Sequence, residues 1–275
     1  MMVQMSLSLS TRWARLLAGA VMAAALAAPL AGCGSAGPKM PPAGSAEPDK
    51  FLFDRGNEEL TKKKWLASRE YFRAVVERYP QSAFRPDAKL AIGDTYILEN
   101  TVESKILAIN EFTEFLSFFP THRRADYAQL RIGYAHFRQM LAPQRDQTET
   151  REAIHEFETF ISRYPDSKLM PEALKYLREA KDRLAQSEFE VGRFYARLNW
   201  CPGAVDRLQA LLKSDPDFIN RDGVYFYLGE CYFKSNQKAQ ALPYYDKLVG
   251  EFAKSDYLSK ARKRIAEIKA GSSPK

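Results

Sequence analysis

The sequence has few of the residues from which catalytic and metal sites are most often built. It contains three cysteines and three histidines in 275 residues. His122, His136 and His155 lack the spacing of a zinc site, and no HExxH, GxSxG, P-loop or GxGxxG motif occurs. The acidic residues are spaced as on helix surfaces and single out no acid–base pair. We therefore predict a protein that is not an enzyme, uses no metal or cofactor, and acts through its surfaces.

Long apolar runs are also scarce. The single one, residues 16–30, follows Arg12 and Arg15. It is too short and too rich in alanine for a comfortable membrane span, and it fits the apolar region of a signal peptide. It leads into Leu-Ala-Gly-Cys at residues 30–33, which resembles the lipobox of bacterial lipoproteins, where the cysteine receives a diacylglyceryl group. We predict a signal peptide over residues 1–32 and lipidation of Cys33; an ordinary cleaved signal with a chance cysteine is the alternative.

The segment after the lipobox has almost nothing to bury. Residues 33–48 are therefore predicted to be the lipidated cysteine and a flexible tether. The residue directly after the cysteine is Gly34 and not aspartate, and in this the sequence resembles lipoproteins that are sorted to the outer membrane. We expect a protein anchored in the outer membrane by its lipid and facing the periplasm. The formal net charge of +7 becomes +5 without Arg12 and Arg15, and this modest excess favours an acidic partner or anionic lipid over nucleic acid in that compartment.

The rest of the chain carries a repeated pattern of glycine, alanine, large apolar residues and proline. The spacing is that of the tetratricopeptide repeat (TPR), in which two helices form a hairpin. Glycine and alanine let the helices approach, aromatic residues fill the space between hairpins, and proline ends the second helix. Five copies are present: Gly56, Phe72, Val75, Pro80; Gly93, Tyr96, Ala108, Phe112, Pro120; Gly133, Ala153, Phe157, Pro165; Gly192, Tyr195, Ala204, Leu208, Leu211, Pro216; and Gly229, Tyr232, Ala241, Tyr245, Leu248.

Departures from this period predict the domain organisation. The stretch between Pro165 and Gly192 is longer than its counterparts and contains no glycine, which predicts one elongated helix over about 171–198. A polar loop is expected at 142–150, and a capping helix, apolar on one face only, near the C-terminus. We predict an all-α solenoid of five TPR-like helix–turn–helix repeats, with repeats 1–3 in residues 49–168 and the long helix, repeats 4–5 and the capping helix in residues 169–270.

Two cysteines remain, Cys201 and Cys231, and the register places them in neighbouring repeats. A disulfide is conceivable in an oxidising compartment. Small buried thiols are the favoured interpretation.

Several stretches go beyond generic repeat character. They are Pro120-Thr121-His122 with Asp126-Tyr127, the loop Arg145-Asp146-Gln147-Thr148, and the run Lys181-Asp182-Arg183-Leu184-Ala185 followed by Glu188, Tyr195 and Trp200. Together with the lipobox, the tether and the long helix, they resemble the BamD family of outer-membrane β-barrel assembly lipoproteins. The resemblance covers the chain from Cys33 to about Phe252.

This resemblance implies a function. Members of the family bind the POTRA domains of the barrel subunit of the assembly machinery and receive unfolded outer-membrane protein precursors, reading a C-terminal strand signal rich in aromatic residues. The resemblance aligns residues 204–208 with the region that meets the last POTRA domain, and implies that Arg207 pairs there with an acidic residue. Arg193 and Arg197 are the next candidates for this partner surface.

The TPR register also predicts a groove for the precursor. First-helix positions that tend to line the concave face are mostly apolar in repeats 1–3 and more charged in repeats 4–5. Some of the apolar members are equally expected to pack against neighbouring helices. The predicted groove residues are Phe53, Asn57, Leu60, Leu90, Asp94, Ile97, Tyr134, Phe137 and Arg138.

Two rival interpretations remain open. Another periplasmic TPR lipoprotein, an adaptor that coordinates cell-envelope growth, would share the repeats but has no reason to share the stretches above. A peptidoglycan-active enzyme would need a cleft with converging carboxylates, and the sequence offers no pattern for one.

Overall fold

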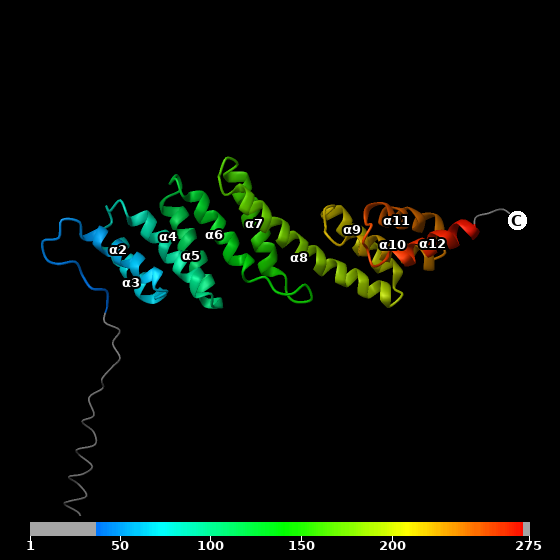
Figure 1. The fold of residues 1–275 in the computed structure, drawn as a ribbon, viewed down its shortest axis with the longest axis horizontal. Coiled ribbons are helices and arrows are strands. Elements are labelled where there is room, and N and C mark those ends of the chain that lie inside the picture. Colours follow the sequence, from blue (N-terminus) through cyan, green and yellow to red (C-terminus); the bar gives the residue numbers. More distant parts are fainter. Residues whose placement is uncertain (1–36, 272–275) are drawn as a thin grey trace, which may run out of the picture. The chain divides into compact units, whose positions relative to one another are not determined.

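The computed structural model describes residues 37–271, and these form helices joined by turns and loops. Residues from Met40 onward make up one compact unit. Each helix packs mainly against the helices before and after it in the chain (Figure 1). The fold is therefore the predicted helical TPR solenoid.

Five helical hairpins follow one another. The first helices of the repeats are α2 (Pro48–Thr61), α4 (Arg85–Glu99), α6 (Ala125–Phe137), α8 (Met170–Arg197) and α10 (Arg221–Lys234). The second helices are α3 (Trp65–Arg78), α5 (Val102–Phe118), α7 (Thr148–Arg163), α9 (Cys201–Ser214) and α11 (Lys238–Glu251). The chain of helices ends with α12 (Leu258–Gly271).

The motif glycines lie where the two helices of each hairpin touch. A Cβ atom on Gly93 would come within 2.6 Å of the Phe112 ring, and one on Gly229 within 2.6 Å of the Tyr245 ring. The same contact recurs at Gly56, Gly133 and Gly192. No side chain fits these positions without displacing a buried neighbour, which is the role that the sequence pattern predicted.

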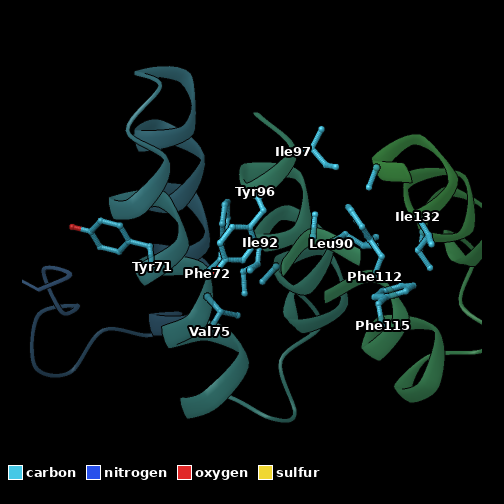
Figure 2. Close-up of a cluster of buried hydrophobic side chains, with 14 of the residues drawn as sticks. Tyr71, Phe72, Val75, Leu90, Ile92, Tyr96, Ile97, Phe112, Phe115 and Ile132 are labelled. Carbon is cyan, nitrogen blue, oxygen red and sulfur yellow. The ribbon is translucent and has the colours of Figure 1, made fainter. Parts of the chain in front are cut away.

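Large apolar side chains fill the space between hairpins. Phe72 of α3 meets Ile92 and Tyr96 of α4 in the cluster drawn in Figure 2. This cluster continues through Phe112 and Phe115 of α5, both fully buried. Further clusters of the same kind occupy the later repeats.

The turns inside the hairpins are short in four repeats. Each contains one residue with positive φ: Lys63, Asn100, Asn199 or Asn236. Asparagine tolerates this left-handed conformation better than most residues. In repeat 3 the turn is replaced by the longer loop 138–147, which begins and ends slightly earlier than the loop predicted at 142–150.

Hydrogen bonds connect successive repeats near the start of the first helix of a repeat. Ser167 Oγ donates to Asp126 at 2.6 Å, and Ser255 Oγ donates to Asp222 at 2.5 Å. Both acceptors stand in the first turn of a helix, where a carboxylate also interacts favourably with the helix dipole. These bonds fix the register between one repeat and the next.

The long helix is confirmed. Helix α8 has 28 residues, and its bounds differ from the predicted 171–198 by one residue at each end. Ala173 and Ala180 pack in the core of repeat 3, whereas Ala185 and Phe189 pack in the core of repeat 4. One continuous helix therefore belongs to two adjoining cores.

The last helix closes the array as predicted. Ala261 and Ile268 of α12 are buried against α11 and its neighbours, while Arg262 and Lys263 face outward. Cys201 and Cys231 are buried free thiols in one small cluster, as favoured by the sequence. Burial, together with the adjacent thiol of Cys201, raises the pKa of Cys231 to about 12.

Candidate binding surfaces

The predicted anchor and the predicted grooves fall in different parts of the chain. The signal peptide and Cys33 lie outside the described residues. Within residues 37–271, none of the helices has the length and apolarity needed to cross a bilayer. The residues predicted for the precursor groove and for the partner surface lie within the described part of the chain.

Burial removes two residues from the predicted precursor groove. Leu90 is fully buried and Ile97 is 7% exposed, and both belong to the cluster shown in Figure 2. They face the neighbouring helices and fill the core. The TPR register of the sequence could not distinguish these buried positions from the solvent-exposed ones, because exposure depends on how adjacent hairpins pack.

Asp94 also has a different role from the predicted peptide contact. Its carboxylate accepts hydrogen bonds from the Tyr127 hydroxyl at 2.8 Å and pairs with Arg131 Nε at 3.0 Å. Burial raises the pKa of Asp94, and this effect outweighs the opposing influence of Arg131 and Tyr127. The carboxylate is thus already satisfied by repeat 3, and it joins repeats 2 and 3.

Three of the residues predicted for the groove are partly exposed on α2. Phe53 stacks on Phe84 with a centroid distance of 5.2 Å. Asn57 Nδ2 donates to the carbonyl oxygen of Phe53 at 3.1 Å, and Leu60 is half-buried nearby on the same helix. These side chains offer an apolar surface with one polar group.

The other predicted groove residues that are accessible lie near the end of α6, beside the start of α8. Tyr134 and Phe137 pack against Tyr176 with centroid distances of 5.2 and 4.9 Å. Arg138 is exposed, and it donates to the Tyr134 hydroxyl at 3.0 Å and to Asn100 Oδ1 at 3.2 Å. Of the residues predicted for the groove, Phe53, Asn57, Leu60, Tyr134, Phe137 and Arg138 are therefore accessible.

Arg207 lies on the outer side of α9, away from the buried Ala204 and Leu208. Its guanidinium pairs with Glu188 of α8 at 3.0 Å, and the Arg207 side chain is 48% exposed. It lines a cavity of about 730 Å³ between α7, α8 and α9. Lys181 and Glu158, which pair at 2.7 Å, stand on the same cavity.

Arg193 and Arg197 do not share this cavity. They line a second one of about 930 Å³, which α8 forms with the loop 138–147. Arg193 is bound to Glu190, whereas Arg197 is exposed. The three arginines predicted for one partner surface therefore belong to two separate sites.

Sequence reasoning missed the exposed apolar residues around the second cavity. Phe194, Leu198 and Trp200 are each more than half exposed. The sequence did contain a signal for them. The helical period places Phe194 and Leu198 on a different face from Phe189 and Ala196, which are buried positions of α8. The structure also offers no group of three or more His, Cys, Asp or Glu side chains that could hold a metal ion among residues 37–271.

Known proteins resemble this chain over most of its length. The family described as outer membrane lipoprotein, YfiO, matches residues 45–234, and a tetratricopeptide repeat matches residues 224–255. The outer membrane protein assembly factor BamD of Caulobacter vibrioides is 26% identical over 77% of this chain and 68% of its own length. BamD of Haemophilus influenzae is 25% identical over 79% of this chain and 84% of its own.

Among solved structures, the TPR2AB domain of yeast Sti1 in complex with an HSP90 peptide aligns with a TM-score of 0.44 and 13% identity, over 81% of this chain and 83% of that one. The family match is much stronger, since it spans well over half of the chain and agrees with relatives from several bacteria. This chain belongs to the BamD family of outer-membrane protein assembly factors.

Proposed function

We propose that this protein is a non-enzymatic scaffold lipoprotein of the machinery that assembles β-barrel proteins in the outer membrane. In this role it binds the barrel subunit through that subunit's POTRA domains and receives unfolded outer-membrane protein precursors. The observation that carries the proposal is the position of Arg207, exposed beside an open cavity in a chain of this family.

The surroundings of Arg207 suit a partner surface. Ile154, Leu184 and Leu211 contribute apolar lining, and charged side chains surround them. The pair with Glu188 is half exposed, and such pairs contribute only about 0–1 kcal/mol to stability. An acidic residue of a docking protein can therefore replace Glu188 at small cost to the fold.

Charge reversal tests this surface. Arg207→Glu should reduce co-purification of the POTRA-bearing subunit at least tenfold, because an unpaired charge in a closed interface costs about 2–5 kcal/mol. Arg262→Glu, on the exposed side of α12, is the matched control and should leave co-purification unchanged. Thermal unfolding of both variants should resemble that of the wild type. Equal recovery of the subunit with Arg207→Glu would place the interface elsewhere.

For the precursor, we propose that the accessible residues on α2, on α6 and directly after α6 form a binding groove. An extended peptide with aromatic side chains needs apolar pockets and a few polar groups to fix its direction. Phe53 and Phe137 supply apolar surface, and Asn57 and Arg138 supply polar contacts. Photo-crosslinkers at Phe53 or Phe137 should capture barrel precursors far more efficiently than one at Phe118, an exposed aromatic residue of α5. Equal capture at Phe118 would reject the groove.

The anchor completes the proposal. A diacylglyceryl group on Cys33, followed by the tether of residues 34–48, would hold the repeats close to the outer membrane. Mass spectrometry of the mature N-terminus should find an acylated cysteine. An N-terminus that begins at another residue and carries no acyl chain would exclude a lipoprotein.

A further inference from the structure

The cavity lined by Arg193 and Arg197 is a groove with two walls. One wall is the last part of α8, and the other is residues 143–145 of the loop in repeat 3. Its volume is about 930 Å³. It lies on a different face of α8 from the cavity beside Arg207, because the α8 residues that line the two cavities differ in helical phase.

The loop wall is held in place by hydrogen bonds. Arg183 of α8 donates to the carbonyl oxygen of Leu141 at 2.9 Å. The Gln147 side chain, 4% exposed, donates to the carbonyl oxygens of Ala142 at 2.9 Å and Arg145 at 3.1 Å. Because these bonds span the loop and attach it to α8, the groove exists before any partner arrives.

The helix wall exposes an unusual amount of apolar surface. Phe194, in the last turn of α8, is 57% exposed, and Leu198, directly after the helix, is 63% exposed. Trp200, 55% exposed, packs edge-on against Tyr195, whose ring also lines the groove. A cluster of large exposed apolar residues on one surface is a common mark of a binding site.

The charges of the groove are unbalanced. Arg145, Arg193 and Arg197 line it, and Glu190 is its only acidic residue. Arg193 satisfies Glu190. Arg145 and Arg197 take part in no ion pair within the described part of the chain. Two guanidinium groups are thus available to an incoming carboxylate, the geometry for which arginine is best suited.

We propose that this groove binds an extended peptide segment of another polypeptide, in which carboxylates alternate with bulky apolar side chains. The carboxylates pair with Arg145 and Arg197, and the apolar side chains pack on Phe194 and Leu198. A small molecule would remain largely in water on side chains that are more than half exposed, whereas a peptide covers such a surface along its length. The two walls also favour a chain that lies between them over a flat lipid surface.

A fluorescence titration tests the proposal. The unit Met40–Lys275, which holds all the buried clusters, is used with Trp65→Phe, so that Trp200 is its single tryptophan. The probe is a short capped peptide of alternating aspartate and phenylalanine, and its match has asparagine in place of aspartate. We expect the aspartate peptide to change Trp200 emission saturably and to bind at least tenfold more tightly than the asparagine peptide.

Variants then assign the contacts. Arg197→Glu should weaken binding of the aspartate peptide at least tenfold, and Phe194→Ser should do the same through the apolar contact. Arg262→Glu, which changes the net charge equally at a distant surface, should leave the affinity within about twofold. Unchanged binding with both groove variants, or equal weakening with Arg262→Glu, would overturn the proposal. So would tighter, Arg197-dependent binding to phosphatidylglycerol vesicles with no response to the peptide, because the groove would then be a lipid site.

Discussion

At the scale of single residues, the motif glycines lie where paired helices leave no room for a Cβ atom. The Tyr245 ring is fully buried and its hydroxyl donates to Glu230 at 2.7 Å, so the ring cannot move away from Gly229. Gly250 of the neighbouring helix α11 has no atom near the position of a Cβ. The two glycines therefore differ in their surroundings while both stand inside helices.

This difference predicts opposite effects of the same substitution. Gly229→Ala should lower the free energy of unfolding by about 1–3 kcal/mol, because the new methyl group overpacks the contact with Tyr245. Gly250→Ala should raise it by about 0.5–1 kcal/mol, because alanine favours the helix and meets no neighbour. Urea unfolding measures both values. A similar effect of the two substitutions would show that helix propensity, and not the close approach, governs Gly229.

At the scale of elements, the capping helix is fastened by one ionic cluster. Arg264 of α12 donates to both carboxylate oxygens of Glu230 on α10, at 2.8 and 3.1 Å. Burial disfavours the charged form of Glu230, but the hydrogen bonds from Arg264 and Tyr245 outweigh it, and the pKa of Glu230 lies below its ordinary value of 4.5. The ionised carboxylate therefore contributes to the stability of the array's end.

The sign of this shift predicts a pH dependence. A carboxyl whose pKa is lowered by folding stabilises the protein above its ordinary pKa, and the contribution disappears as the pH falls through the folded pKa. Glu230→Gln should therefore be less stable than the wild type near neutral pH, and the difference should shrink as the pH falls below about 4.5. Chemical unfolding across this range measures it. Glu152→Gln, an exposed position of α7, is the control and should differ little from the wild type at any pH.

A constant difference between Glu230→Gln and the wild type down to pH 3 would contradict this account, because the loss would then come from packing alone.

At the scale of the whole unit, α8 connects two sets of repeats. Its first half packs in the core of repeat 3 and its second half in the core of repeat 4. In a solenoid each repeat is stabilised mainly by its neighbours, so cooperativity between distant repeats passes through the elements that join them. The continuity of α8 should therefore determine whether the repeats unfold together.

A proline in this helix tests that expectation. Glu179 is exposed near the middle of α8, and Glu179→Pro removes one helical hydrogen bond and clashes with the preceding turn, at a cost of about 3 kcal/mol or more. Calorimetry should show the unfolding transition split into two, whereas Glu179→Ala should keep the wild-type profile. A single transition shifted to lower temperature would mean that contacts other than helix continuity couple the repeats.

The sequence by itself determined the repeats, the long helix and the capping helix. The motif glycines and their partners, such as Gly93 and Phe112, meet within one hairpin, so their spacing along the chain is fixed by local geometry. The length of α8 could be predicted for a similar reason, because neither glycine nor proline occurs between Pro171 and the motif glycine Gly192. The family resemblance seen in the sequence agrees with the family match over residues 45–234.

Only the tertiary structure decided which surface residues are open and which sites they form. Leu60 and Leu90 look alike in the sequence, but the next hairpin buries Leu90 and leaves Leu60 partly exposed. Arg145 and Arg197 are distant in the chain and line one groove, because hydrogen bonds hold the loop against α8. The spacing of residues along the chain determines the contacts within one hairpin. Exposure and charge pairing depend in addition on how neighbouring hairpins pack against each other, which the sequence of a single repeat does not determine.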